Sequence, residues 1–266
     1  MNRREFLGAS TVAAMALAAP GRSDGAARGP KALLELRTYR FASPAKQKAF
    51  EEFLAAAMVP ALNRAGIQPV GVFRMLAADN PKMLKEDSTD LLVLLPHATL
   101  ESVITLNDRL LADAEYTKAG AAVINAPQKD PAYARMEVNL FIGFDECPGV
   151  ETPAKAPSRL FQLRIYEAHT EERCRMKVRM FNEGGEIAIF RRVGMNPVFF
   201  GHAIAGTKMP NLTYMLGFDD EAAMKKGWAA FLADPAWTKL KNDETYKDTV
   251  SNITNIVLRP SAASQI

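Results

Sequence analysis

The feature that most constrains the fold of this chain is an internal duplication. Three motifs of the first half return in the same order in the second half: LELRTY at 34–39 as FQLRIY at 161–166, GIQPV at 66–70 as GMNPV at 194–198, and LLADAEYT at 110–117 as FLADPAWT at 231–238. One structural unit is therefore written twice. At 266 residues the chain is long enough for each copy to bury a core of its own.

Both copies have the same predicted order of elements. Alternating and β-rich runs predict strands at 33–41, 68–76, 90–95 and 136–144 in the first copy, and at 160–168, 196–204, 211–218 and 253–259 in the second. Apolar residues at helical spacing predict helices that begin at Ser43 and Leu100, and helices over 170–193 and 219–233. The order β-α-β-β-α-β predicts an α+β fold of two ferredoxin-like units. Because each sheet has helices on one face only, we expect the two sheets to face each other.

Composition places the boundaries of these units. The segment 146–158 contains Pro148, Gly149, Pro153 and Pro157, which is typical of a linker. The expected domains are therefore 31–145 and 159–260.

The first residues have the order of an export signal. RREFL at 3–7 is followed by an uncharged run of 11 residues at 9–19, and ALA at 16–18 offers small residues for cleavage. The run is too short to cross a bilayer as a helix. The Arg-Arg-x-Phe-Leu core resembles a twin-arginine signal. We therefore expect residues 1–30 to be a signal peptide and flexible leader, and the body to be periplasmic or otherwise extracytoplasmic.

Composition also excludes several classes of partner. A net charge of +3 spread over the chain does not predict nucleic-acid binding, which needs basic residues concentrated on one face. The sequence contains no run of about 20 apolar residues, so no membrane span is predicted. Three scattered histidines without Cys or Asp at ligand spacing predict no metal site. Phosphate-binding glycine loops and the G-x-S-x-G elbow are missing from the sequence, so no cofactor is expected.

One long stretch resembles a known family. MFNEGGEIAIFRRVGMNPVFFG at 180–201, with MPNLTYML at 209–216, is similar to the NIPSNAP family, and the resemblance extends more weakly over the first copy, from 32 to 259 in all. It implies a dimeric α+β barrel in which two ferredoxin-like sheets enclose a space, here within one chain. The family offers no settled catalytic residues. The related barrel superfamily includes small monooxygenases and haem enzymes, which is an analogy of fold.

Strand alternation selects the candidate site residues. Leu34, Leu36, Phe161, Leu163 and Ile165 share the side expected to pack on the helices. The opposite side is expected to point into the space between the sheets, where a pocket for an acidic or polar small molecule would be lined by Arg37, Tyr39, Arg164, Tyr166 and Tyr214. The alternative is that each Arg and Tyr only staples the two sheets, with Arg37 paired to Glu35.

Three further candidates, Glu183, Glu186 and His202, lie in the second copy. Gly184 and Gly185 interrupt the helix at 170–193, either as a kink or as an opening that lets a ligand approach Glu183 or Glu186 as a base. His202 is either a general base or a hydrogen-bonded interior residue. Trp228 is expected in the buried stripe of the helix at 219–233.

These observations leave two functions open. The first is an exported NIPSNAP-like protein that binds a small molecule or a protein partner in or around the barrel. The alternative is a cofactor-independent monooxygenase or isomerase that works in the barrel pocket. Catalysis itself and assembly into a homo-oligomer stay open at this point.

Overall fold

This computed structural model describes residues 30–266. Within the described residues, the first half of the chain folds into four strands and five helices. The elements are β1 (Leu33–Arg40), α1 (Pro44–Phe53), α2 (Val59–Arg64), β2 (Gly71–Arg74), β3 (Leu91–His97), α3 (Leu100–Leu111), α4 (Ala114–Ala119), α5 (Ala121–Ile124) and β4 (Arg135–Gly143). A π-helical turn over Leu54–Met58 joins α1 to α2. Ser43 caps α1 and Pro44 occupies its first turn, as the sequence predicts.

The second half repeats this order. Its elements are β5 (Leu160–Glu167), α6 (Glu171–Asn182), α7 (Glu186–Arg192), β6 (Asn196–Ala205), β7 (Asn211–Phe218), α8 (Glu221–Ala233), α9 (Pro235–Lys241), a 3₁₀ turn (Glu244–Tyr246) and β8 (Asn252–Pro260). The expected helix at 170–193 is split, because Gly185 adopts φ +82° between α6 and α7. A Cβ at Gly184 would lie 2.5 Å from the carbonyl oxygen of Met180. The glycine pair therefore serves the helix break.

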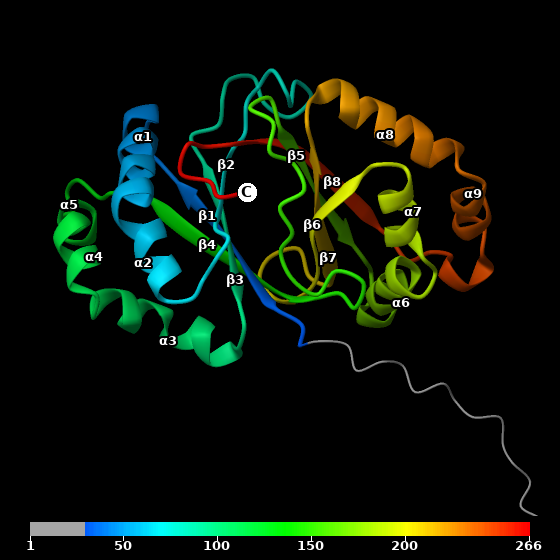
Figure 1. The fold of residues 1–266 in the computed structure, drawn as a ribbon, viewed down its shortest axis with the longest axis horizontal. Helices are drawn as coiled ribbons and strands as arrows, with labels where there is room; N and C mark the ends of the chain where they lie inside the picture. The colour runs from blue at the N-terminus through cyan, green and yellow to red at the C-terminus, as the bar shows by residue number, and fades with distance from the viewer. Residues whose placement is uncertain (1–29) are drawn as a thin grey trace, which may run out of the picture.

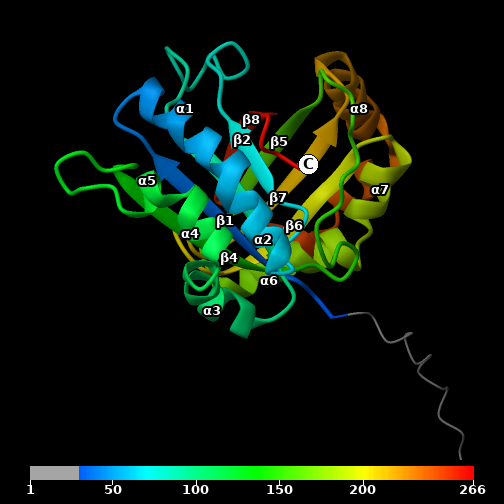
Figure 2. The ribbon, with the colours of Figure 1, turned by 60° about the vertical axis from the view of Figure 1, so that its left-hand side comes forward.

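All strands of the described chain join in one closed barrel, in the order β1-β3-β2-β8-β5-β7-β6-β4. Each half contributes a ferredoxin-like sheet, β4-β1-β3-β2 or β8-β5-β7-β6, and neighbouring strands are antiparallel throughout. The helices of the two halves lie on opposite outer sides of the barrel (Figure 1). Figure 2 shows α1, α2 and α4 lying over the strands of the first half. The predicted α+β barrel of two ferredoxin-like sheets is confirmed.

The two sheets meet at two seams of different length. At one seam, β4 pairs with β6 from Gly143 opposite Gly201 to Leu140 opposite Ala205, with a bulge. At the other, β2 pairs with β8 only at Phe73 and Arg74. Residues 261–266 extend this shorter seam, since Ser261 N donates to Val72 O at 2.9 Å and Gln265 N donates to Val70 O at 2.8 Å.

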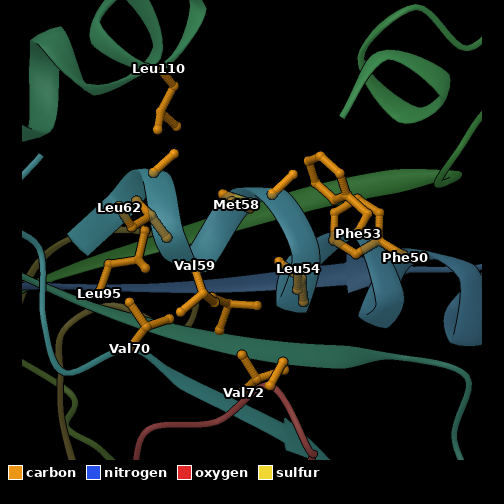
Figure 3. Packing of buried hydrophobic residues seen from close by; sticks show 14 of the residues in the cluster. Phe50, Phe53, Leu54, Met58, Val59, Leu62, Val70, Val72, Leu95 and Leu110 are labelled. Atoms are coloured by element: carbon orange, nitrogen blue, oxygen red, sulfur yellow. The ribbon is translucent and has the colours of Figure 1, made fainter. Parts of the chain in front are cut away.

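Three apolar clusters stabilise this arrangement. One lies between the first sheet and its helices, where Val59 lies beside Val70 and Val72 and Leu62 lies beside Leu95 (Figure 3). A second lies between the second sheet and its helices. The third fills the barrel interior with side chains from both sheets and with Ile266 from the segment after β8. The sheet residues include Leu34, Leu36, Phe73, Phe141, Phe161, Leu163, Phe199 and Met215.

This distribution corrects the expected orientation of the strand faces. Leu34, Leu36, Phe161 and Leu163 lie in the barrel interior, not against the helices. Tyr39 belongs instead to the cluster under the first-half helices, and Tyr166 and Tyr214 to the cluster under the second-half helices. Alternation shows which residues share a face, but in a barrel covered by helices both faces are buried. Polarity was therefore a poor guide to which face turns inward.

Two expectations concern other parts of the chain. The short helices α4, α5 and α9 were not predicted, because their apolar patterns are too short for helical periodicity to be visible. The predicted signal peptide lies almost entirely outside the described residues. Within residues 30–266, no helix has both the length and the apolar character needed to cross a membrane.

Candidate functional site

A hydrogen-bonded network connects three side chains on the outer face of β1. Arg37 donates from Nε to Glu35 Oε1 at 2.6 Å and from Nη2 to Glu35 Oε2 at 3.2 Å. Its Nη1 donates to Tyr39 Oη at 3.3 Å. The three residues alternate along the strand, so their side chains share one face. Arg37 is 6% exposed and Glu35 4% exposed, so this bidentate ion pair is formed away from water.

His97, the last residue of β3, extends the network. Its Nε2 lies 3.0 Å from Glu35 Oε2, and its Nδ1 lies 3.1 Å from Ser102 Oγ in the first turn of α3. Because β3 is the neighbour of β1, with His97 opposite Leu33, the imidazole reaches Glu35 diagonally across the sheet. Glu35 is thus held between Arg37 and His97.

The electrostatics of this network fix its protonation states. Burial alone raises the pKa of Glu35, but the hydrogen bond with His97 and the charge of Arg37 outweigh it and hold the pKa below its ordinary value. Burial lowers the pKa of Arg37, yet Tyr39 and Glu35 raise it above the ordinary value overall. Burial raises the pKa of Tyr39. At neutral pH the network therefore holds a carboxylate, a guanidinium and a neutral phenol.

Arg37 and Tyr39 line a cavity of about 320 Å³ between β1 and the first-half helices, called here the first-half pocket. Its other walls come from α1, the π-helical turn, α3, α4, α5 and the segment that enters β4: Phe50, Phe53, Met58, Asn107, Leu110, Leu111, Tyr116, Val123, Ile124, Tyr133 and Met136. Leu111 is 57% exposed and Tyr133 is 38% exposed, so the pocket opens to the surface beside them. Its volume lies at the lower end of the range for small-molecule sites.

Aromatic rings supply much of this wall. The ring of Tyr39 lies 4.6 Å from that of Phe50 and 5.2 Å from that of Tyr133, centroid to centroid. The rings of Phe53 and Tyr116 are 5.9 Å apart. The first-half pocket therefore combines an apolar, aromatic wall with a charged donor and a phenol at its base.

The equivalent region of the second half is filled by its own side chains. The Arg164 guanidinium lies over the ring of Trp228 at 4.6 Å and over that of Tyr166 at 5.4 Å. Trp228 Nε1 donates to Gln162 Oε1 at 2.7 Å, and Tyr214 Oη donates to Tyr166 Oη at 3.1 Å. Arg164 Nε is buried without a hydrogen-bond partner. The structure therefore separates Arg37 and Tyr39 from Arg164, Tyr166 and Tyr214 instead of bringing the five together.

The remaining candidates lie elsewhere in the second half. Glu186 is buried and forms an ion pair with Lys177, from Oε2 to Nζ at 2.8 Å. Glu183 lies beside the glycine pair in a surface depression of about 500 Å³. His202 Nε2 lies 3.1 Å from Glu171 Oε1, although this contact does not have the geometry of a hydrogen bond. Burial lowers the pKa of His202. None of these three residues lines the first-half pocket.

Sequence analysis missed two parts of the site. It did not select His97, because the predicted strand ends at 95, whereas β3 continues to His97. Extending the predicted strand by two residues, to 97, would have placed the imidazole of His97 on the same face as Leu95. It also missed Asn107, although comparison of the two copies of the repeat places Asn107 against Trp228.

Within residues 30–266, no three His, Cys, Asp or Glu side chains converge closely enough to hold a metal ion.

Comparison with known families finds a match in the second half. Residues 161–265 match the NIPSNAP family model, so this part of the chain is similar to a NIPSNAP domain. Comparison with curated proteins gives no significant match.

Two solved structures share the fold of the whole barrel, and a third resembles part of it. A "putative monooxygenase" from Lactobacillus acidophilus is 10% identical with a TM-score of 0.58, over 86% of this chain and 94% of that chain. A second, from Fusobacterium nucleatum, is 6% identical with a TM-score of 0.53, over 87% of this chain and 93% of that chain. An uncharacterised NIPSNAP-like domain protein from Burkholderia xenovorans is 21% identical with a TM-score of 0.38, over 41% of this chain and 90% of that chain. At these identities the first two likenesses show the fold alone.

Proposed function

We propose that this chain is an exported NIPSNAP-like protein that binds a small molecule in the first-half pocket. The observation that carries the proposal is the position of Arg37 and Tyr39 at the base of an otherwise apolar cavity that opens to the surface. A few convergent polar groups within an apolar wall are the usual composition of a ligand site. The NIPSNAP match at 161–265 supports the family part of the proposal, which we extend to the first half because both halves share one element order.

The two polar groups define what the ligand must offer. The bonds of Arg37 to Glu35 and Tyr39 use three of its five N–H groups, which leaves donors for an incoming oxygen. Tyr39 accepts from Arg37, so its own hydroxyl proton is available for donation. Both residues therefore present donors to the cavity. A ligand with a carboxylate, phenolate or carbonyl oxygen would satisfy them.

The alternative function is a cofactor-independent monooxygenase or isomerase that acts in the same pocket. The buried Glu35–His97 contact and the description of the two neighbouring structures favour it. An enzyme of this kind needs a base within reach of the substrate. No carboxylate or imidazole is among the residues that line the pocket, and Glu35 and His97 are connected to it only through Arg37. Binding is therefore the function that the geometry favours.

Native mass spectrometry of the protein purified from its own periplasm tests the proposal. We expect a small-molecule adduct that is weakened in Tyr39→Phe, which loses a hydroxyl donor but keeps the ring, and retained in Tyr166→Phe, the equivalent change outside the pocket. An adduct-free spectrum together with no thermal stabilisation by small carboxylates would remove the binding function. Oxygen uptake or isomerisation of the released compound would favour the enzyme instead.

A further inference from the structure

Two helices of the repeat can be compared position by position. Thr99 caps α3 and Asp220 caps α8, each accepting a backbone hydrogen bond from three residues further on. Beyond these helices, Asp113 caps α4 and Asp234 caps α9. The spacing between the two caps is the same in both halves, so the helices align without a gap. Asn107 is therefore the equivalent of Trp228.

In the second half, this position supplies an aromatic cover for a buried arginine. The indole of Trp228 lies 4.6 Å from the guanidinium carbon of Arg164, within the range of a cation–π contact. Its Nε1 donates to Gln162, two residues before Arg164 on the same strand. The indole also packs edge-on against Phe231, at 5.6 Å. One planar ring thus covers the guanidinium and fills the space beneath α8.

In the first half, the arginine is present and the ring is not. Arg37 stands where the second half has Arg164, and Glu35 stands where it has Gln162. Asn107 replaces the indole with a short amide, and both Asn107 and Arg37 line the first-half pocket. The pocket therefore lies over the guanidinium in the place that Trp228 occupies in the other half.

We propose that the first-half pocket takes a planar aromatic molecule whose ring lies over Arg37 as the indole of Trp228 lies over Arg164. The inference rests on the proposed binding function and names the chemical class of the ligand. The rings of Phe53, Tyr116 and Tyr133 in the wall suit a flat aromatic occupant. An oxygen substituent on the ring, such as a carboxylate, would meet the donors of Arg37 and Tyr39.

The test uses two carboxylates of similar size and the same charge as probes, 2-naphthoate and its saturated counterpart decahydro-2-naphthoate, in isothermal titration calorimetry and thermal-shift assays. We expect the aromatic probe to bind about tenfold more tightly, as a desolvated cation–π contact would give. Asn107→Trp fills the pocket from within and should abolish that binding while leaving the fold intact by circular dichroism. Asp108→Trp places the same side chain on the exposed face of α3 and should bind the probe as the wild type does.

A second variant tests whether removing the indole opens a binding cavity in the second half. Trp228→Asn should create an equivalent cavity over Arg164 and raise the stoichiometry of the aromatic probe from one to two per chain. If it fails to fold, Asn107→Trp and Asp108→Trp still decide the matter.

The outcomes separate the class of ligand from the existence of a site. Equal affinity for the two probes, or aromatic binding that survives Asn107→Trp, would overturn the aromatic inference while the binding function stands. Absence of binding by both probes would also overturn the inference, and the native mass spectrum then shows whether the binding function falls with it.

Discussion

Arg37 forms a two-point ion pair with Glu35, the residue two positions earlier on its own strand, through Nε at 2.6 Å and Nη2 at 3.2 Å. The charge that the barrel buries on β1 is therefore neutralised within β1. No other strand has to supply the cation's partner, and Arg37 still lines the first-half pocket. The second half keeps the arginine and replaces the carboxylate with Gln162.

This difference predicts unequal effects of removing the two arginines. Arg37→Met leaves the Glu35 carboxylate buried without its cation, and we expect it to lower the free energy of unfolding by about 3–5 kcal/mol. Arg164→Met leaves only a neutral amide at 162 and should cost clearly less. Urea unfolding followed by circular dichroism measures both.

The double variant is the control for this interpretation. Glu35→Gln combined with Arg37→Met should be more stable than Arg37→Met alone, since no carboxylate is then stranded. Equal losses for the two arginine variants, or a double variant that is simply the sum of the single ones, would contradict it.

The protonation of Glu35 predicts a pH dependence. Its pKa lies below the ordinary value, because His97 and Arg37 together outweigh the effect of burial. The folded state therefore binds this proton more weakly than the unfolded state does. The stability that Glu35 contributes is complete above its unfolded pKa, about 4.3 for a glutamate, and is lost as the pH falls through the folded pKa.

Comparison of wild type with Glu35→Gln isolates this contribution. The difference in free energy of unfolding should be largest near neutral pH and should shrink as the pH falls below about 4. A series of urea titrations over this range measures it. A difference that stays constant with pH would show that the ionised form of Glu35 contributes nothing.

The fold could be predicted from the sequence because the internal repeat defines the order of the elements in both halves. Duplicated motifs such as those at 34–39 and 161–166 define one β-α-β-β-α-β unit, and two such units have few ways to cover their open faces. The orientation of the faces could not be predicted in the same way. Both sides of β1 are buried, one by the barrel interior and the other by helices, so the side that carries Arg37 and Tyr39 is decided by packing across the whole barrel.

The site was partly visible in the sequence. Arg37 and Tyr39 were selected by alternation along one strand, and the Arg37–Glu35 pair was recognised as an alternative to ligand binding. That the second-half equivalents would be covered depends on Trp228, a residue that helical periodicity assigns only to a buried stripe. Whether a buried tryptophan fills a core or covers a charge is a matter of three-dimensional position, which periodicity along one helix does not contain.

The proposed export signal predicts an effect on localisation. Replacing both Arg3 and Arg4 by Lys should retain the precursor in the cytoplasm, because the arginine pair is the feature that a twin-arginine translocase reads. Immunoblots of cytoplasmic and periplasmic fractions measure the distribution. Replacing Arg22 and Arg28, which lie outside the motif, should leave it unchanged. Unaltered periplasmic accumulation of the Arg3 and Arg4 variant would rule out the twin-arginine route.

The last prediction concerns the seam between β2 and β8. Their direct pairing covers only Phe73 and Arg74 of β2, and the chain from 261 onward continues along this strand, so the side chain of Ile266 enters the barrel interior with 2% of its surface exposed. Arg159 donates to the carbonyl oxygen of Ile266 from Nη2 at 3.1 Å and fixes it there.

Ile266→Ala should therefore lower the free energy of unfolding by about 2–4 kcal/mol, as a cavity in a packed core does. Ile253→Ala, at a position 46% exposed on β8, is the matched control and should change it by less than about 0.5 kcal/mol. Urea unfolding of both variants decides it, and equal small losses would mean that the segment does not contribute to closing the barrel.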